Sequence, residues 1–262
     1  MESRTHLSPD AVVAVDLDGV VWRGRTPIPG SADAVRRLRG AGHRVAFVTN
    51  NSARPVGDVL SQLADCGIAA TAHDVVGSAE AAVHLVAAQC APGARVLAAA
   101  GPGVVEALTA AGFEVVREGT ADAVVAGWHR DFDFDRLTVA MRAIRAGACF
   151  IATNTDATYP TETGLLPGGG AIVAAIATAS GVEPMVAGKP HAPMAALVRD
   201  RFGTRGVMVG DRIDTDGAFA AELDWPFALV LSGVTESVPQ PRPAFVAHDL
   251  AEFTSQLLAA AP

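Results

Sequence analysis

Short apolar runs and helix-like segments alternate along the whole of this 262-residue chain. The apolar runs predict strands, and the segments with helical spacing, several of them closed by Gly, predict helices between the strands. Strands that alternate with helices form parallel sheets covered by helices on both faces, so the pattern predicts an α/β fold. The predicted strands are 12–15, 44–48, 95–100, 114–116, 123–126, 149–152, 206–209, 227–231 and 244–246, and the predicted helices are 32–39, 55–65, 79–88, 104–110, 137–145, 171–179, 193–201, 219–222 and 250–260.

The composition excludes two classes of partner. The formal net charge is −8 and no cluster of Lys and Arg offsets it, which argues against nucleic acid. The longest apolar run, 171–179, is too short to cross a bilayer, and residues 1–10 are polar and unlike a signal peptide. The cysteines Cys66, Cys90 and Cys149 form no CxxC pair, and we expect reduced thiols in a cytoplasmic protein.

The strand predicted at 12–15 ends in two carboxylates, Asp16 and Asp18. The two-residue period of a strand points both side chains to the same side. Open α/β sheets bind ligands at the carboxyl ends of their strands. Two carboxylates at such a position repel each other unless they share a cation or a proton, and Mg²⁺ is a cation that favours carboxylate and phosphate oxygens. This segment therefore predicts a magnesium site.

Lysine occurs once in the chain, at Lys189, although Lys and Arg together number 20. A composition that otherwise uses only Arg keeps one ammonium, and that ammonium lies between Gly188 and Pro190. Lys and Arg differ wherever a compact point charge is needed, so Lys189 is a candidate functional residue. The alternative is that one Lys remains by chance.

Two further polar segments follow predicted strands. Thr49, Asn50 and Asn51 follow the strand 44–48, and a Thr hydroxyl with the next backbone N–H can bind a phosphate oxygen. The alternative for this segment is a helix N-cap, for which Ser52 is suitable. The strand 206–209 leads to an acidic segment that is either a binding site or a solvated turn; its carboxylates belong to Asp211, Asp214 and Asp216.

The four segments, in this order, resemble the motifs of the haloacid dehalogenase superfamily of Mg²⁺-dependent phosphatases. The chain is most similar to the branch that includes 4-nitrophenylphosphatases and the phosphatases of phosphoglycolate, pyridoxal phosphate and glycerol 3-phosphate. The resemblance covers nearly the whole chain. The matching motifs are Asp16-Leu17-Asp18-Gly19, Thr49-Asn50-Asn51, Gly188-Lys189-Pro190 and Gly210-Asp211-Arg212-Ile213-Asp214-Thr215-Asp216.

The resemblance implies a Rossmann-like parallel-sheet core with a large α/β cap domain inserted between the second and third motifs. The core is expected at 1–76 and 187–262, and the cap at 77–186. One departure from the family pattern is Gly217, which stands where an Ile is expected and is predicted to loosen the packing of the helix that follows.

The resemblance also implies roles for the acidic residues. Asp16 is expected to attack the phosphorus and form an aspartyl-phosphate, while Asp18 protonates the leaving oxygen and then deprotonates the attacking water. The carboxylates of Asp16 and Asp211 and the backbone carbonyl of Asp18 are expected to hold Mg²⁺. Asp216 and Asp214 are expected to orient metal-bound water or the lysine.

The remaining implied roles concern the substrate, a small phosphorylated metabolite. Thr49, Asn50 and Lys189 are expected to hold the phosphoryl oxygens. In the segment 154–161, read as a loop, the candidate substrate contacts are Asn154, Asp156 and above all Tyr159, which is the only Tyr; an Asx-type turn is the alternative for the first two. The absence of a basic residue in that loop favours a small leaving group such as glycerol or glycolate over a nucleotide.

Three function classes remain open. A phosphatase is favoured over a phosphotransferase or mutase because a large cap does not preclude water. A non-catalytic phospho-ligand binding protein is disfavoured because Asp16 and Asp18 are both present. The tryptophans Trp22, Trp128 and Trp225 are interpreted as packing residues; for Trp128 and His129, which follow the strand 123–126, contact with a ligand is the alternative. The oligomeric state is open, with a homodimer as one option.

Overall fold

The computed structural model describes residues 11–161 and 164–259, so the polar segment 1–10 and the predicted helix end at Ala260 lie outside the described residues. Its larger sheet has six strands in the order β15-β14-β13-β1-β4-β5, and every neighbouring pair is parallel. The strands are β1 (Val12–Val15), β4 (Arg44–Thr49), β5 (Val75–Gly77), β13 (Gly206–Gly210), β14 (Phe227–Val230) and β15 (Phe245–Ala247).

Alternation along β1 explains why helices cover both faces of this sheet. Val13 and Val15 pack into one apolar cluster, and Val12 and Ala14 pack into another. Successive side chains of a strand point to opposite faces, so a strand that is apolar throughout needs a cover on each side. One face is covered by α1 (Ser31–Gly40), α2 (Val56–Asp65) and α9 (Leu250–Ala259), and the other by α7 (Ala192–Phe202) and α8 (Ala218–Leu223).

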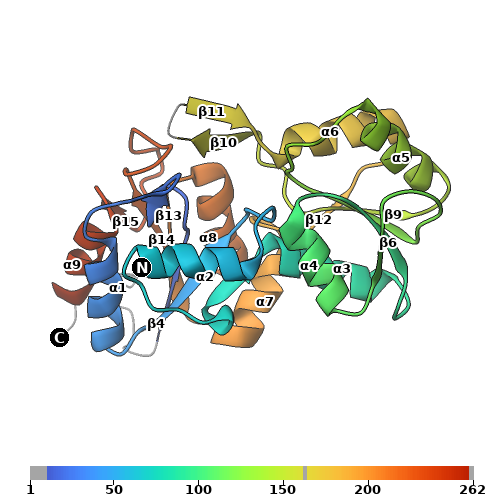
Figure 1. Ribbon diagram of the computed structural model, residues 1–262. Helices are drawn as coiled ribbons and strands as arrows, with labels where there is room; N and C mark the ends of the chain where they lie inside the picture. The colour runs from blue at the N-terminus through green and yellow to red at the C-terminus, as the bar shows by residue number, and fades with distance from the viewer. Residues whose placement is uncertain (1–10, 162–163, 260–262) are drawn as a thin grey trace.

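A second parallel sheet has five strands in the order β12-β9-β8-β6-β7. These strands are β6 (Arg95–Ala99), β7 (Glu114–Val116), β8 (Ala123–Ala126), β9 (Cys149–Ala152) and β12 (Met185–Val186). One face is covered by α3 (Ser78–Gln89) and α4 (Pro102–Ala110), and the other by α5 (Phe134–Arg145) and α6 (Gly169–Ser180). Figure 1 shows the two layered units side by side, and the α/β prediction is confirmed.

The sheets bear on the predicted division into core and cap without testing its boundaries. Along the chain, β5 is the last strand of the larger sheet before the strands of the smaller sheet begin. The strand β12 is the last strand of the smaller sheet, and β13 belongs to the larger sheet again. The boundaries at 76 and 187 stay a prediction. None of the described helices combines the length and the apolar character that crossing a membrane requires.

The segment 154–161 is not the loop that the sequence predicted. It contains β10 (Thr158–Thr161), which pairs antiparallel with β11 (Gly164–Pro167). In Figure 1 this hairpin extends from the unit with α5 and α6 toward the unit with α1 and α2. Each strand has only four residues, and pairing between such short strands depends on their surroundings more than on their own residue types.

Other short elements were also missed. They are the strands β5 and β12, the hairpin of β2 (Trp22–Arg23) with β3 (Thr26–Pro27), the 3₁₀-helix η1 (Ala72–Asp74) and the π-helix η2 (Ile213–Gly217). The prediction of loosened packing after Gly217 is wrong. A Cβ at Gly217 would lie 3.3 Å from Cε1 of Phe227, so that ring fills the space beside the glycine, and Phe219 of α8 is fully buried.

Candidate active site

The candidate site lies where the central strands of the larger sheet end. Asp16 follows β1, Thr49 ends β4 and Asp211 follows β13, and these three strands are parallel neighbours. Parallel neighbours present their carboxyl ends at one edge, which brings these side chains together. The cavity at this edge is lined by Asp16, Asp18, Thr49, Asn50, Asn51, Trp128, Asn154, Asp156, Thr158, Tyr159, Gly168, Gly169, Lys189, Asp211, Arg212, Thr215, Asp216 and Val234.

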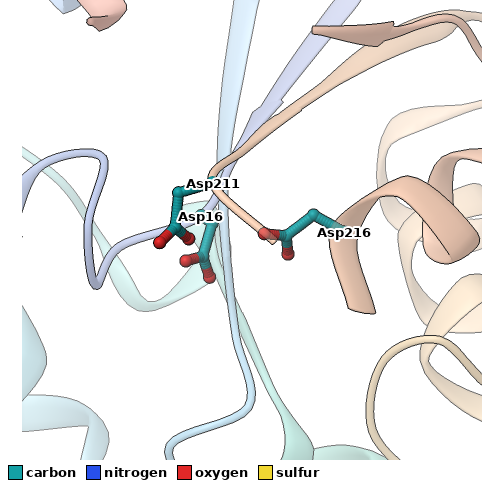
Figure 2. A group of neighbouring side chains, drawn as sticks. All are labelled: Asp16, Asp211 and Asp216. Carbon is teal, nitrogen blue, oxygen red and sulfur yellow. The ribbon is translucent and has the colours of Figure 1, made fainter. Parts of the chain in front are cut away.

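Three buried carboxylates form the centre of the site. Among the residues described, Asp16, Asp211 and Asp216 offer ligand oxygens that all lie within 4.8 Å of one another. Figure 2 shows the carboxylates of Asp16 and Asp211 next to each other, with Asp216 pointing toward them. Burial, and then repulsion by Asp216, raises the pKa of Asp211 to about 7. Burial also raises the pKa of Asp16 well above its usual range, although Lys189 opposes the shift.

Lys189 is the cation within this group. Its Nζ atom donates to Oδ1 of Asp16 at 2.6 Å, to Oδ1 of Asp216 at 2.7 Å and to the carbonyl oxygen of Val48 at 3.2 Å. An ammonium has three donors, and all three are used here. Burial lowers the pKa of Lys189, but the two carboxylates outweigh burial and hold the pKa above its usual value. One ammonium among three carboxylates leaves negative charge that a divalent cation can balance.

The surroundings of Asp211 fit a metal ion. Its Oδ2 atom accepts a hydrogen bond from the backbone N–H of Val234 at 2.6 Å, while its buried Oδ1 atom has no partner among the described residues. A buried polar atom without a partner is costly, and a bound cation would supply one. Glycines make room for this carboxylate, because a Cβ at Gly19 or Gly233 would lie 2.5 or 1.9 Å from its Oδ2 atom.

The two other acidic residues of the fourth motif differ in position. Asp216 is fully buried; its Oδ1 atom contacts Lys189 and its Oδ2 atom accepts from the backbone N–H of Arg212 at 3.1 Å. The side chain of Asp214 is 69% exposed and pairs with the guanidinium of Arg212 at 3.0 Å. The structure therefore does not bring Asp214 into contact with Lys189, and a role of Asp214 toward metal-bound water stays a prediction. Both carboxylates lie within the π-helix η2, which points them in different directions, and the sequence pattern does not show this.

Asp18 is held by Trp22, a residue outside the four motifs. The indole Nε1 of Trp22 donates to Oδ1 of Asp18 at 3.0 Å. Burial raises the pKa of Asp18, and the hydrogen bond from Trp22 opposes that shift. Gly19 adopts a φ of 87°, a left-handed conformation that permits the turn after Asp18. The β2–β3 hairpin places Trp22, and no motif in the sequence signals this contact.

The side chain of Asn50 has a role that the sequence did not reveal. The prediction concerned its backbone N–H, but its side-chain amide brackets the peptide of Lys189. Oδ1 of Asn50 accepts from the Lys189 N–H at 2.8 Å, and Nδ2 donates to the Lys189 carbonyl at 3.0 Å. Nδ2 also donates to both carboxylate oxygens of Asp156, at 3.1 and 3.2 Å. The hydroxyl of Thr49 accepts from the backbone N–H of Asn51 at 3.0 Å.

The predicted substrate-contacting residues all lie in the cavity wall. Nδ2 of Asn154 donates to the Asn50 carbonyl at 2.7 Å, which ties the segment after β9 to the segment after β4. Asp156 is bound by Asn50 as described above, and burial raises its pKa. The ring of Tyr159 lies 5.4 Å from that of Trp128, and its hydroxyl accepts from Nδ2 of Asn51 at 3.5 Å. Burial raises the pKa of Tyr159 to about 12, so the phenol is protonated at neutral pH.

Of the two further candidates for ligand contact, Trp128 lines the cavity and His129 does not. Trp128 lines the cavity and donates from Nε1 to the carbonyl of Pro167 at 3.0 Å, which fixes the ring against the β10–β11 hairpin. His129 is not among the lining residues; it is buried, with Nδ1 at 2.9 Å from the Gly127 carbonyl and its ring edge-on to Phe132. Ser52 does not cap a helix, because α2 begins at Val56 and the Ser52 hydroxyl donates to Thr153 Oγ1 at 2.8 Å.

Comparison with known proteins places the chain in a family. Residues 13–114 match a family described as "Haloacid dehalogenase-like hydrolase", and residues 186–253 match one described as "HAD-hyrolase-like". The chain is 44% identical to the D-glycerol 3-phosphate phosphatase of Mycobacterium tuberculosis, over 95% of this chain and 72% of that protein. It is 35% identical to an acid sugar phosphatase of Staphylococcus saprophyticus, over 93% of this chain and 96% of that protein.

A solved structure agrees with these relatives. The crystal structure of a glycerol phosphate phosphatase from Mycobacterium tuberculosis in complex with magnesium has a TM-score of 0.85 and 40% sequence identity to this chain, and the match covers 95% of this chain and 78% of that one. The chain belongs to the haloacid dehalogenase-like hydrolases, as its motifs predicted. The predicted enzyme class also agrees with these relatives, which are named as phosphatases.

Proposed function

We propose that this protein is a Mg²⁺-dependent phosphatase that hydrolyses a small phosphomonoester through an aspartyl-phosphate. The observation that carries the proposal is the ammonium of Lys189 held between Asp16 and Asp216, close to the Oδ1 atom of Asp211, which has no hydrogen-bond partner in the described part of the chain. In this proposal residues 1–76 and 187–262 form the core that holds these groups, and residues 77–186 form the cap.

Asp16 is the proposed nucleophile. Its carboxylate oxygen forms a bond to phosphorus as the bond from phosphorus to the leaving oxygen breaks. The Nζ atom of Lys189 lies 2.6 Å from Oδ1 of Asp16. Its positive charge is therefore proposed to stabilise both the carboxylate and the phosphoryl oxygens. The carboxylates of Asp16 and Asp211 and the backbone carbonyl of Asp18 would hold Mg²⁺. When bound, Mg²⁺ neutralises charge on the carboxylates and on the phosphoryl group.

Asp18 is the proposed acid and base. Its raised pKa favours the protonated carboxyl that must donate to the leaving oxygen, and Trp22 holds one of its oxygens in place. After the leaving group departs, the Asp18 carboxylate takes the proton from the water that attacks the aspartyl-phosphate. The hydroxyl of Thr49, the backbone N–H of Asn50 and the ammonium of Lys189 are proposed to bind the phosphoryl oxygens.

For the substrate we propose glycerol 3-phosphate in preference to 2-phosphoglycolate. The carboxylate of Asp156 lines the cavity, and the guanidinium of Arg212, which also lines it, is already paired with Asp214. Carboxylates accept hydrogen bonds from the hydroxyls of a glycerol or sugar leaving group and repel the carboxylate of a glycolate leaving group. The glycerol phosphate and acid sugar phosphatases among the relatives support the same choice.

Phosphate release tests this proposal. The purified protein is expected to release inorganic phosphate from glycerol 3-phosphate with MgCl₂ and to lose that activity with EDTA. Preference for glycerol 3-phosphate over 2-phosphoglycolate is expected to fall by roughly tenfold in Asp156→Asn, since one repelling charge is removed. A product that carries the phosphoryl group on an added alcohol would indicate a phosphotransferase, and binding without phosphate release would indicate a non-catalytic protein.

The proposal extends to the partner, the location and the oligomeric state of the enzyme. A small phosphorylated metabolite is its proposed partner, and a cytoplasmic location is supported by the three free cysteines, Cys66, Cys90 and Cys149. A homodimer stays a prediction, which light scattering of the purified protein tests.

A further inference from the structure

Two of the three cysteines meet on the smaller sheet, away from the candidate active site. Cys90 directly follows α3, and Cys149 begins β9. Both are bound to one carbonyl oxygen, that of Asp122: the backbone N–H of Cys149 donates to it at 2.9 Å and the thiol of Cys90 donates to it at 4.0 Å. The two cysteines are therefore neighbours on either side of the Asp122 carbonyl.

The pair is packed and yet reachable. Both cysteines pack against the same apolar cluster, together with Ala94, and both are partly exposed. They line an open hollow of about 520 Å³ to which Asp122 and Gly147 also contribute. The third cysteine, Cys66, follows α2 and packs against a different cluster, so it provides an internal control. Burial, and then the charges of Cys149 and Asp122, raises the pKa of Cys90.

We propose that Cys90 and Cys149 are a redox pair that hydrogen peroxide closes to a disulfide. One thiolate attacks the peroxide oxygen, which gives a sulfenic acid and water. The second thiol then attacks that sulfur, which forms the S–S bond and releases a second water. Two thiols thus lose two electrons and two protons to one molecule of hydrogen peroxide. Neighbouring thiols favour this outcome because the second step needs no encounter between molecules.

The position of the pair indicates what the disulfide does. Cys149 stands at the start of β9, whereas Ala152 ends that strand and leads to Asn154 in the catalytic cavity. The link therefore ties the end of α3 to the far end of β9, away from the proposed chemistry. It joins residues distant in sequence, which restricts the unfolded chain and stabilises this unit. We expect a rise in Tm of about 5–15 °C.

The experiment uses the Cys66→Ser variant of the full chain. Trypsin cleaves after Arg44 and Arg95 but not at the Arg54–Pro55 bond, so one tryptic peptide of the natural sequence holds both Cys66 and Cys90 and carries two thiols. With Cys66 replaced, any disulfide within the molecule is Cys90 to Cys149. The reduced variant is treated with H₂O₂, free thiols are alkylated, and the protein is digested without reductant for mass spectrometry. We expect the linked peptide, loss of both thiols and a higher Tm that dithiothreitol reverses.

The controls decide the remaining outcomes. The single variants Cys90→Ser and Cys149→Ser are expected to form no internal link and to show no rise in Tm after the same treatment. Sulfinic or sulfonic acid at either cysteine without the linked peptide would overturn the proposal, and so would links found only between two molecules. A linked peptide with an unchanged Tm would refute the stabilising role. Phosphate release plays no part in these readouts, so failure of the proposed function leaves this test intact.

Discussion

Replacement of Lys189 tests the charge balance of the site. In Lys189→Met the side chain keeps its approximate length and loses its ammonium, so two ion pairs of 2.6 and 2.7 Å disappear. Lys189 is 3% exposed, and removal of one partner from a buried ion pair costs about 3–5 kcal/mol because the charges that remain are uncompensated. At about 2–4 °C per kcal/mol for a chain of this size, the Tm is expected to fall by roughly 6–20 °C.

Lys189→Arg separates charge from geometry. The guanidinium keeps the positive charge, but it is planar and broader than the ammonium that now reaches Asp16, Asp216 and the Val48 carbonyl. We expect kcat to fall at least about a hundredfold, the size of effect seen when one donor to a transition-state oxygen is removed. We also expect a smaller loss of Tm than in Lys189→Met.

Thermal denaturation and phosphate release are measured on both variants, with EDTA and with MgCl₂. Mg²⁺ is expected to raise the Tm of Lys189→Met more than that of the unmodified protein, because the cation then supplies the only positive charge among Asp16, Asp211 and Asp216. An unchanged Tm and kcat in both variants would refute this reasoning and would make the single lysine an accident of composition.

The remaining predictions address other parts of the site. Asp16→Asn is expected to lower kcat by a thousandfold or more, by analogy with removal of other nucleophiles, while circular dichroism stays unchanged. Asn50→Ala removes the amide that brackets the Lys189 peptide, and misplacement of the ammonium is expected to lower kcat roughly tenfold to a hundredfold at a small change in KM. Tyr159→Ala is expected to change kcat/KM for glycerol 3-phosphate relative to sugar phosphates more than it changes hydrolysis of 4-nitrophenyl phosphate, and equal losses on all would argue against substrate contact. Burial raises the pKa of Asp211 from 3.8 to about 7, so the folded, metal-free protein binds a proton that the unfolded chain releases. The Tm of the metal-free protein is therefore expected to fall as the pH rises from about 4 through 7, and Mg²⁺ is expected to reduce that fall.

Much of the fold could be predicted because its pattern is local. The strand β1 is apolar at every position from Val12 to Val15, which marks a strand covered on both faces, and helices with regular apolar spacing follow each such strand. The β10–β11 hairpin was missed because its strands are short and polar in part, and its pairing depends on residues distant from each strand. The strand β5 was missed for a similar reason, since Val75–Gly77 is too short to show a period.

The candidate site could be predicted only in part. Residues at strand ends, such as Asp16 and Asp211, were found because topology brings strand ends together. Contacts that depend on side-chain direction were not: the Asn50 amide on the Lys189 peptide and the Trp22 indole on Asp18 follow from the paths of loops. The pairing of Asp214 with Arg212 could not be predicted either, because spacing along the chain does not show which way the π-helix turns a carboxylate.

Chemical trapping of the aspartyl-phosphate tests the proposed mechanism most directly. The protein is mixed with glycerol 3-phosphate and MgCl₂, quenched in acid during turnover, and reduced with borohydride, which converts an aspartyl-phosphate to homoserine. Mass spectrometry of the digested protein then identifies the modified position. We predict homoserine at position 16, with none in Asp16→Asn or without substrate. Homoserine at position 18, or turnover with unmodified Asp16 in every quenched sample, would contradict the assignment of Asp16 as the nucleophile.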